Sequence, residues 1–95
     1  MPVSEEQLER CVEILRGYGA TKIVLFGSIL ETPDDVRDLD LACKGIEGWE
    51  FFRAAAELED VVDLPVDLVP LDVDARMTRH IEKWGRVLYE SSEAA

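Results

Sequence analysis

The feature that most constrains this chain is its hydrophobic pattern, which switches repeatedly between helical and strand periodicity within 95 residues. Residues 4–16 place their apolar side chains three and four positions apart, the spacing of one helix face. Short apolar or alternating runs, typical of strands, follow at TKIVLF (21–26), DLDLAC (38–43) and VDLV (66–69). The alternation predicts an α/β (α+β) fold in which helices flank a small mixed β-sheet.

Capping and breaking residues mark where these elements begin and end. Ser4 and Gln7 fit a capping box, Gly17 fits a helix end, and Pro70 ends the third strand. The expected order is α-β-β-α-β-α-β, with elements at 4–16, 21–26, 38–43, 49–60, 66–69, a helix capped by Asp72 and ended by Gly85, and a strand at 86–89. Residues 27–37 are expected to form a connection. Because domains cluster around 100 to 150 residues, we expect one domain over residues 1–95.

Charge restricts the partners of this chain. The 21 acidic and 10 basic residues give a net charge of −11, which repels nucleic-acid phosphates and anionic lipid surfaces. We therefore expect neither direct nucleic-acid binding nor membrane binding. A divalent cation or a basic protein surface is attracted to such a field instead.

Cysteine usage and hydropathy indicate an ordinary cytoplasmic protein. Cys11 and Cys43 have no CxxC spacing, so they predict neither a disulfide framework nor a zinc site, and both are interpreted as small core residues. No apolar run approaches the roughly 18 residues that suggest a membrane span. The N-terminal residues contain no basic segment followed by an apolar one, so no signal peptide is predicted.

Three groups of residues suggest a chemical site. Gly27-Ser28 follows the first predicted strand, where glycine admits a phosphate close to the backbone and serine adds a hydroxyl. Asp38 and Asp40 alternate along a strand, which places both carboxylates on one face, and carboxylates are ligands that Mg²⁺ prefers. Asp67 interrupts an apolar strand, where a carboxylate is costly unless it is paired or bound to a cation. This combination is what two-metal nucleotidyl transfer needs.

The same residues resemble a known family. The run LFGSILETPDDVRDLDLAC, with nine residues between Ser28 and Asp38, is similar to the minimal nucleotidyltransferase (MNT) domains of the polymerase β superfamily. The resemblance extends through VDLV to the closing IEKWGRVLYE. In place of the arginines that usually follow the Gly-Ser pair, this chain has Ile29 and Leu30.

The resemblance implies a role for each matched residue. Gly27 and Ser28 would hold the triphosphate of ATP, and Arg37, which stands where a serine is common, would replace part of the missing positive charge. Asp38 and Asp40 would bind two Mg²⁺ ions, and Asp67 would complete the metal site and help to activate the acceptor hydroxyl.

A partner is also implied by the resemblance. Members of the family are commonly antitoxins paired with an all-helical HEPN ribonuclease toxin. The implied reaction is transfer of AMP from ATP to a tyrosine of that toxin, and a homo-oligomer or a hetero-oligomer is compatible with the sequence.

Other readings of these residues stay open. Asp38 and Asp40 could form the solvated face of a half-exposed strand, and Asp67 could pair with Arg37 or Lys44. In function, the main alternative is a catalytically degenerate antitoxin that neutralises its partner by binding alone. A nucleotidyltransferase for RNA or a small molecule fits less well, because RNA requires a basic surface.

The remaining distinctive residues have structural interpretations. The core is expected to contain the aromatic residues of the two later helices, Trp49, Phe51, Phe52 and Trp84. The alternative is that one or two of the seven aromatic residues of this small domain are exposed for a partner. His80, with no second histidine, is expected at the surface or the edge of the core. Ordinary solvated charges are expected for the basic stripe Arg76, Arg79 and Lys83 and for the acidic run Glu57, Glu59, Asp60 and Asp63. Alternatively, the basic stripe binds the β- and γ-phosphates or the acidic surface of a partner. The acidic run could likewise form the binding surface for a basic toxin.

Overall fold

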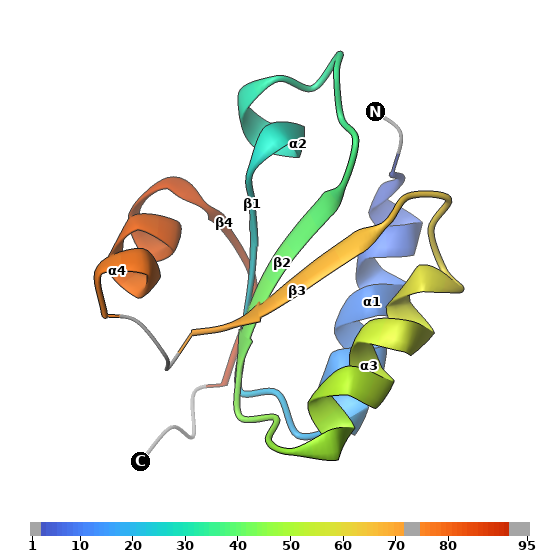
Figure 1. Ribbon diagram of the computed structural model, residues 1–95, viewed down its shortest axis with the longest axis vertical. Coiled ribbons are helices and arrows are strands. Elements are labelled where there is room, and N and C mark those ends of the chain that lie inside the picture. Colours follow the sequence, from blue (N-terminus) through green and yellow to red (C-terminus); the bar gives the residue numbers. More distant parts are fainter. Residues whose placement is uncertain (1–2, 72–74, 92–95) are drawn as a thin grey trace.

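The computed structural model describes residues 3–71 and 75–91, and it has the predicted mixed α/β architecture. Figure 1 shows a sheet with helices on both faces. In chain order the elements are α1 (Glu5–Gly17), β1 (Lys22–Phe26), α2 (Ser28–Glu31), β2 (Leu39–Lys44), α3 (Trp49–Glu59), β3 (Val66–Pro70), α4 (Ala75–Trp84) and β4 (Arg86–Glu90). No helix among the described residues is long and apolar enough to cross a membrane.

The sheet has the strand order β3-β2-β1-β4. The central strand β1 runs antiparallel to both β2 and β4, whereas β2 and β3 are parallel and are connected through α3. Parallel neighbours need a crossover of this kind, because a tight hairpin can join only antiparallel strands. As a result, the side chains of paired residues in β2 and β3 lie on the same face of the sheet.

Alternation along the strands divides the core between the two faces of the sheet. One face packs against α1 and α3 through Ile23, Leu25, Leu39, Leu41 and Cys43. On the other face, Val24 and Ala42 pack with Leu71 and with Ile81 of α4. The predicted burial of Cys11 and Cys43 is confirmed, and both thiols are free. Burial raises the pKa of Cys11 to about 11.

The capping box predicted for the first helix is confirmed. The Ser4 hydroxyl accepts a hydrogen bond from the Gln7 backbone N–H at 3.0 Å, and the Gln7 side chain accepts one from the Ser4 N–H at 2.8 Å. Gln7 also donates to the carbonyl of Val61 at 3.1 Å. The cap therefore ties the start of α1 to the segment that follows α3.

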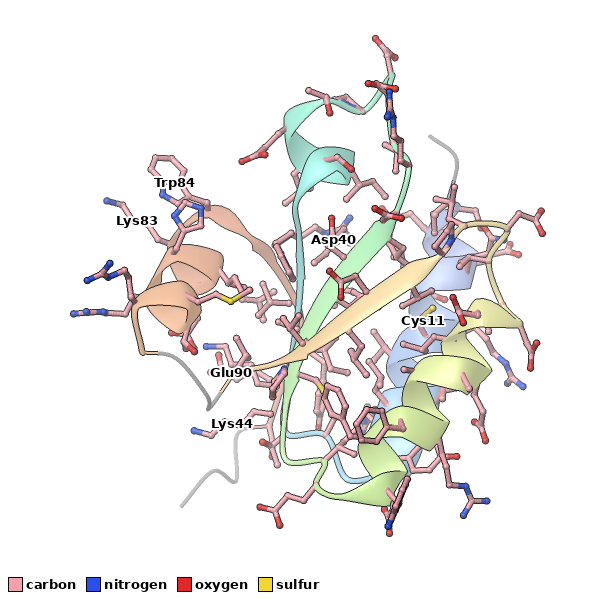
Figure 2. All side chains as sticks on the ribbon, in the orientation of Figure 1. Cys11, Asp40, Lys44, Lys83, Trp84 and Glu90 are labelled. Atoms are coloured by element: carbon pink, nitrogen blue, oxygen red, sulfur yellow. The ribbon has the colours of Figure 1, made fainter. Side chains whose placement is uncertain are left out.

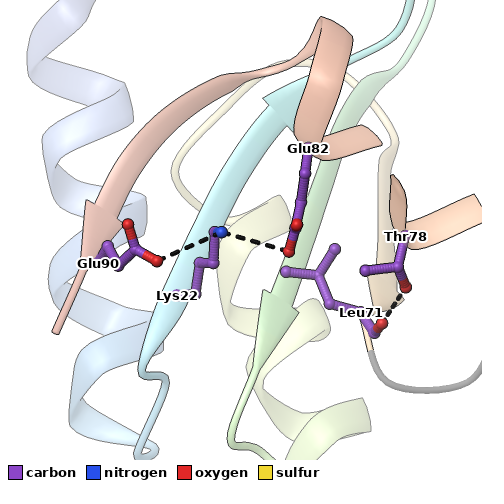
Figure 3. Close-up of polar contacts among 5 residues, drawn as sticks. All are labelled: Lys22, Leu71, Thr78, Glu82 and Glu90. Carbon is purple, nitrogen blue, oxygen red and sulfur yellow. Dashed lines mark hydrogen bonds and ion pairs between the residues drawn. The ribbon is translucent and has the colours of Figure 1, made fainter. Parts of the chain in front are cut away.

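Polar contacts hold α4 on the sheet (Figure 3). Lys22 of β1 lies 3.2 Å from a carboxylate oxygen of Glu82 in α4 and 3.3 Å from one of Glu90 in β4. Near the start of α4, the Thr78 hydroxyl donates a hydrogen bond to the Leu71 carbonyl. These contacts fix α4 against the face of the sheet that also carries Asp40.

One element is absent from the predicted order. The segment 27–37, expected to be a connection only, contains the four-residue helix α2. Four residues are too few to show helical periodicity in a sequence, so the helix could not be recognised from the pattern. The predicted helix cap Asp72 and the predicted helix residue Val73 lie outside the described residues.

The expected core position of the helical aromatic residues is wrong for three of the four, one more than the one or two that the alternative allowed. Exposed fractions are 83% for Trp49, 67% for Phe52 and 64% for Trp84. The buried face of α3 is formed by Ala54 and Leu58, with Phe51 half-buried beside them, and this turns Trp49 and Phe52 to the outside. In α4, Ile81 makes the contact with the core. His80 is exposed, as predicted.

Candidate active site

A glycine turn at the end of β1 builds the first part of the site. Gly27 has φ 83° and ψ −151°, and the backbone then enters α2 at Ser28. A Cβ atom at Gly27 would clash with Oδ2 of Asp40 and lie only 2.8 Å from its Cγ. Glycine at this position therefore permits both the positive φ and the close approach of the Asp40 side chain.

Asp40 is the centre of the site. It is half-buried on β2, opposite Phe26 of β1 on one side and Asp67 of β3 on the other. Figure 2 shows it near the end of β2 that approaches α2. The backbone N–H of Ser28 donates a hydrogen bond to its carboxylate. The Gly-Ser turn and the second aspartate of the DLD run are thus in direct contact, as a shared site requires.

Burial and neighbouring negative charges both disfavour ionisation of Asp40. Burial raises the pKa of Asp40, the negative charges of Asp67 and Asp38 raise it further, and the Ser28 hydrogen bond lowers it. The folded protein therefore holds this proton more tightly than the unfolded chain does. Stability falls as the pH rises through the folded-state pKa of Asp40, unless a cation offsets the added charge.

Asp67 differs from the expectation of a costly buried carboxylate, because its side chain is exposed. Its strand β3 is at the edge of the sheet, where alternate positions face solvent. Parallel register nevertheless places it beside Asp40 on the same face. Arg37, considered as a partner for Asp67, lies instead 3.7 Å from Asp35, with its side chain 83% exposed.

The three aspartates supply a suitable ligand chemistry but not a preformed metal cage. Asp38 is exposed immediately before β2, while Asp40 and Asp67 lie side by side in adjacent strands. Within 3–71 and 75–91, no group of three or more His, Cys, Asp or Glu side chains is arranged to hold a metal ion. The donor chemistry still fits Mg²⁺, because it consists of carboxylates whose mutual repulsion a cation relieves.

A pocket of about 200 Å³ adjoins the Gly27 turn. Three elements line it: the end of β1 and the turn (Phe26, Gly27), α2 (Leu30, Glu31) and α4 (Met77, His80, Ile81, Trp84). The α4 residues recur at positions i, i+3, i+4 and i+7, so the sequence indicated that they share a helix face. The sequence did not indicate that this face is opposite α2.

Comparison with protein families identifies the class. Residues 9–94 match the family model described as Polymerase beta, Nucleotidyltransferase. This match spans most of the chain, and the protein therefore belongs to the polymerase beta nucleotidyltransferase family. No curated protein sequence matches it significantly.

Solved structures share the fold. One, a toxin–antitoxin with AMP-PNP, contains a chain 22% identical, with a TM-score of 0.75 over 96% of this chain and 77% of the other. Another is a tri-AMPylated HEPN toxin from Shewanella oneidensis in complex with MNT antitoxin, at 22% identity and a TM-score of 0.73 over 92% and 72%. A third, assigned as a minimal nucleotidyltransferase, is 24% identical with a TM-score of 0.66 over 85% and 91%. The predicted family and fold are confirmed.

Proposed function

We propose that this protein is an antitoxin that transfers AMP from ATP to a hydroxyl, that of a tyrosine, on an all-helical HEPN-type toxin. The observation that carries the proposal is the contact of the Gly27-Ser28 turn with Asp40, next to Asp38 and Asp67. Membership of the nucleotidyltransferase family and the fold shared with a tri-AMPylated toxin complex support it. Such use of ATP suits the expected cytoplasmic location.

Each residue has a distinct task in this proposal. Gly27 leaves room for the Asp40 carboxylate beside the turn that would hold the triphosphate, and Ser28 offers its hydroxyl at the start of α2. Asp38, Asp40 and Asp67 would hold two Mg²⁺ ions, which supply positive charge to the phosphates when bound. Arg37, exposed in the connection before β2, would have to leave Asp35 to reach the nucleotide.

The proposed reaction exchanges a phosphoanhydride bond of ATP for a phosphodiester bond to the acceptor. The acceptor oxygen forms a bond with the α-phosphorus of ATP, the bond from that phosphorus to the α,β-bridging oxygen breaks, and pyrophosphate leaves. The acceptor proton passes to a carboxylate, for which exposed Asp67 is placed next to Asp40. No oxidant or reductant is required.

A second candidate is an antitoxin that acts by binding alone. Ile29 and Leu30, rather than arginines, follow the Gly-Ser pair, and Arg37 is paired with Asp35. The described residues also lack a preformed group of metal ligands. In this case the site would be a remnant and the acidic surface would contact the toxin directly.

Transfer of labelled AMP tests the first candidate. The protein is incubated with Mg²⁺, a purified HEPN-type toxin and ATP labelled at the α-phosphate. We expect label on the toxin, and mass spectrometry should place one or more AMP groups on tyrosine. ATP labelled at the γ-phosphate should transfer no label, because that phosphate leaves with pyrophosphate.

Aspartate variants separate catalysis from binding. Asp38→Asn and Asp40→Asn should each lower transfer by about 10² or more, a loss typical of removing a charge-stabilising group. Asp63→Asn, with the same charge change in the exposed turn after α3, is the matched control and should retain full activity. Full transfer by either site variant would contradict the mechanism. Toxin neutralisation by both variants without any transfer would favour the binding-only antitoxin.

A further inference from the structure

The pocket between α2 and α4 is continuous with the candidate active site. Gly27 lines the pocket, and the Asp40 carboxylate lies where a Cβ atom at this position would be. The ribose and base of a nucleotide whose phosphates lie at the Gly27-Ser28 turn are therefore within reach of this pocket. Apart from Gly27, no residue that lines the pocket has a role in the proposed reaction.

The walls of the pocket have the chemistry of a site for a flat ring. Ile81, 3% exposed, lies at the inner side, while Leu30 and Met77 are partly exposed at the rim. Trp84 adds a large aromatic surface that is 64% exposed. Figure 2 shows Trp84 and Lys83 projecting together from α4, and the Lys83 ammonium lies 5.3 Å from the Trp84 ring centroid. Glu31 adds one carboxylate acceptor to the wall.

Size restricts what the pocket can hold. Its volume of about 200 Å³ is below the ~300 to 1,000 Å³ range of sites for whole drug-sized ligands. It suits one fragment of a ligand, such as a single heterocyclic base, with the remainder of the ligand outside. A base offers apolar faces to aromatic and aliphatic side chains, and its exocyclic amine can donate to a carboxylate such as Glu31.

We propose that this pocket binds the nucleobase of the nucleotide substrate, with the base packed against Trp84. The inference rests on the proposed function, since it assumes that the phosphates bind at Gly27-Ser28. Trp84 is then a binding residue that determines which nucleotide is used. Exposure of this ring to solvent in the protein alone is consistent with a role in contacting a ligand.

Tryptophan fluorescence can test the proposal with the protein alone. The chain has two tryptophans, so Trp49→Phe leaves Trp84 as the only reporter. With Mg²⁺ present, ATP should change the Trp84 emission in a saturable way, and tripolyphosphate should bind without that change. UTP, which has a smaller ring and no exocyclic amine, should bind more weakly than ATP.

Variants at the two tryptophans provide the matched comparison. Trp84→Ala should raise the Kd for ATP about tenfold or more, a factor within the range measured for a lost base–aromatic stack, and leave the Kd for tripolyphosphate unchanged in calorimetry. Trp84→Phe should restore most of the ATP affinity. Trp49→Ala removes an even more exposed tryptophan, which does not line this pocket, and should bind ATP like the parent protein.

The outcomes distinguish this inference from the proposed function. Equal affinity for ATP and tripolyphosphate, or an unchanged ATP affinity in Trp84→Ala, would overturn the base pocket while nucleotide binding at Gly27-Ser28 still stands. The pocket would then be a candidate site for the aromatic ring of the acceptor tyrosine. If neither ATP nor tripolyphosphate binds, the proposed transferase itself fails.

Discussion

Two glycines allow the role of a single residue in this site to be tested. Gly27 and Gly48 each precede a helix with a positive φ, 83° and 64° respectively, and similar ψ angles of −151° and −142°. A Cβ atom at Gly48 would have no neighbour within 4 Å, whereas a Cβ atom at Gly27 would overlap with the Asp40 carboxylate. The backbone strain of a substitution is therefore comparable at the two positions, but the contact with Asp40 is specific to Gly27.

Alanine at these glycines should separate backbone strain from damage to the site. Gly48→Ala should lower the free energy of unfolding by about 1 to 3 kcal/mol, the usual cost of holding an L-residue in a backbone region that only glycine adopts readily, without affecting ATP binding. Gly27→Ala should cost more and abolish Mg²⁺-dependent ATP binding, because Asp40 must move. Chemical denaturation and calorimetry measure the two effects. Normal ATP binding by Gly27→Ala would show that Asp40 need not lie against the turn.

At the scale of an element, α3 shows that apolar composition does not decide which face is buried. The helix carries three large aromatic side chains in its first turn, yet its core contacts come mainly from Ala54 and Leu58. Trp49 and Phe52 contact each other on the outside, with ring centroids 6.2 Å apart. Stability should therefore depend on the smaller aliphatic residues of the helix.

Paired substitutions in α3 test this distribution. Leu58→Ala should destabilise the protein by about 2 to 5 kcal/mol, because Leu58 is fully buried and its truncation leaves a cavity. Trp49→Ala should change the free energy of unfolding by only about 0.5 kcal/mol or less, as is usual for an exposed position. Urea denaturation measures both. A larger loss for Trp49→Ala than for Leu58→Ala would contradict the assignment of the buried face.

At the scale of the whole molecule, the dominant property is the net charge of −11. The protein measures 38 × 27 × 22 Å. At about 0.01 M salt the screening length is about 30 Å, so the excess acidic residues repel one another across the whole structure. At about 0.1 M salt the screening length is about 10 Å, and only neighbours interact. Local ion pairs, such as the Arg86–Glu5 contact at 2.9 Å, offset a part of this repulsion.

Thermal unfolding should therefore depend on salt. Raising sodium chloride from about 0.01 to about 0.1 M at neutral pH, with a chelator present, should raise Tm, because screening favours the compact anionic state. Each kcal/mol of relieved repulsion corresponds to roughly 4 to 8 °C in a domain of this size. The chelator serves as the control, since it removes any divalent cation held by Asp38, Asp40 and Asp67. A Tm that decreases with salt would mean that attractive ion pairs outweigh the net charge.

Much of the architecture was determined by local patterns in the sequence. Periodicity and breaking residues predicted seven of the eight elements found in residues 3–71 and 75–91, in their correct order, because amphipathic spacing and capping act within one or two helical turns. The short helix α2 was missed, because four residues are too few to show a helical repeat of apolar side chains. The functional residues were proposed from spacing and family resemblance, and their roles stay predictions.

Tertiary structure alone decided which of these residues meet. Asp40 and Asp67 are far apart in the chain but adjacent in the parallel register of β2 and β3. The same packing leaves Asp67 and Trp84 exposed and closes a pocket between α2 and α4. Sequence periodicity defines the face on which a side chain lies, whereas long-range strand pairing and helix packing determine what that face meets.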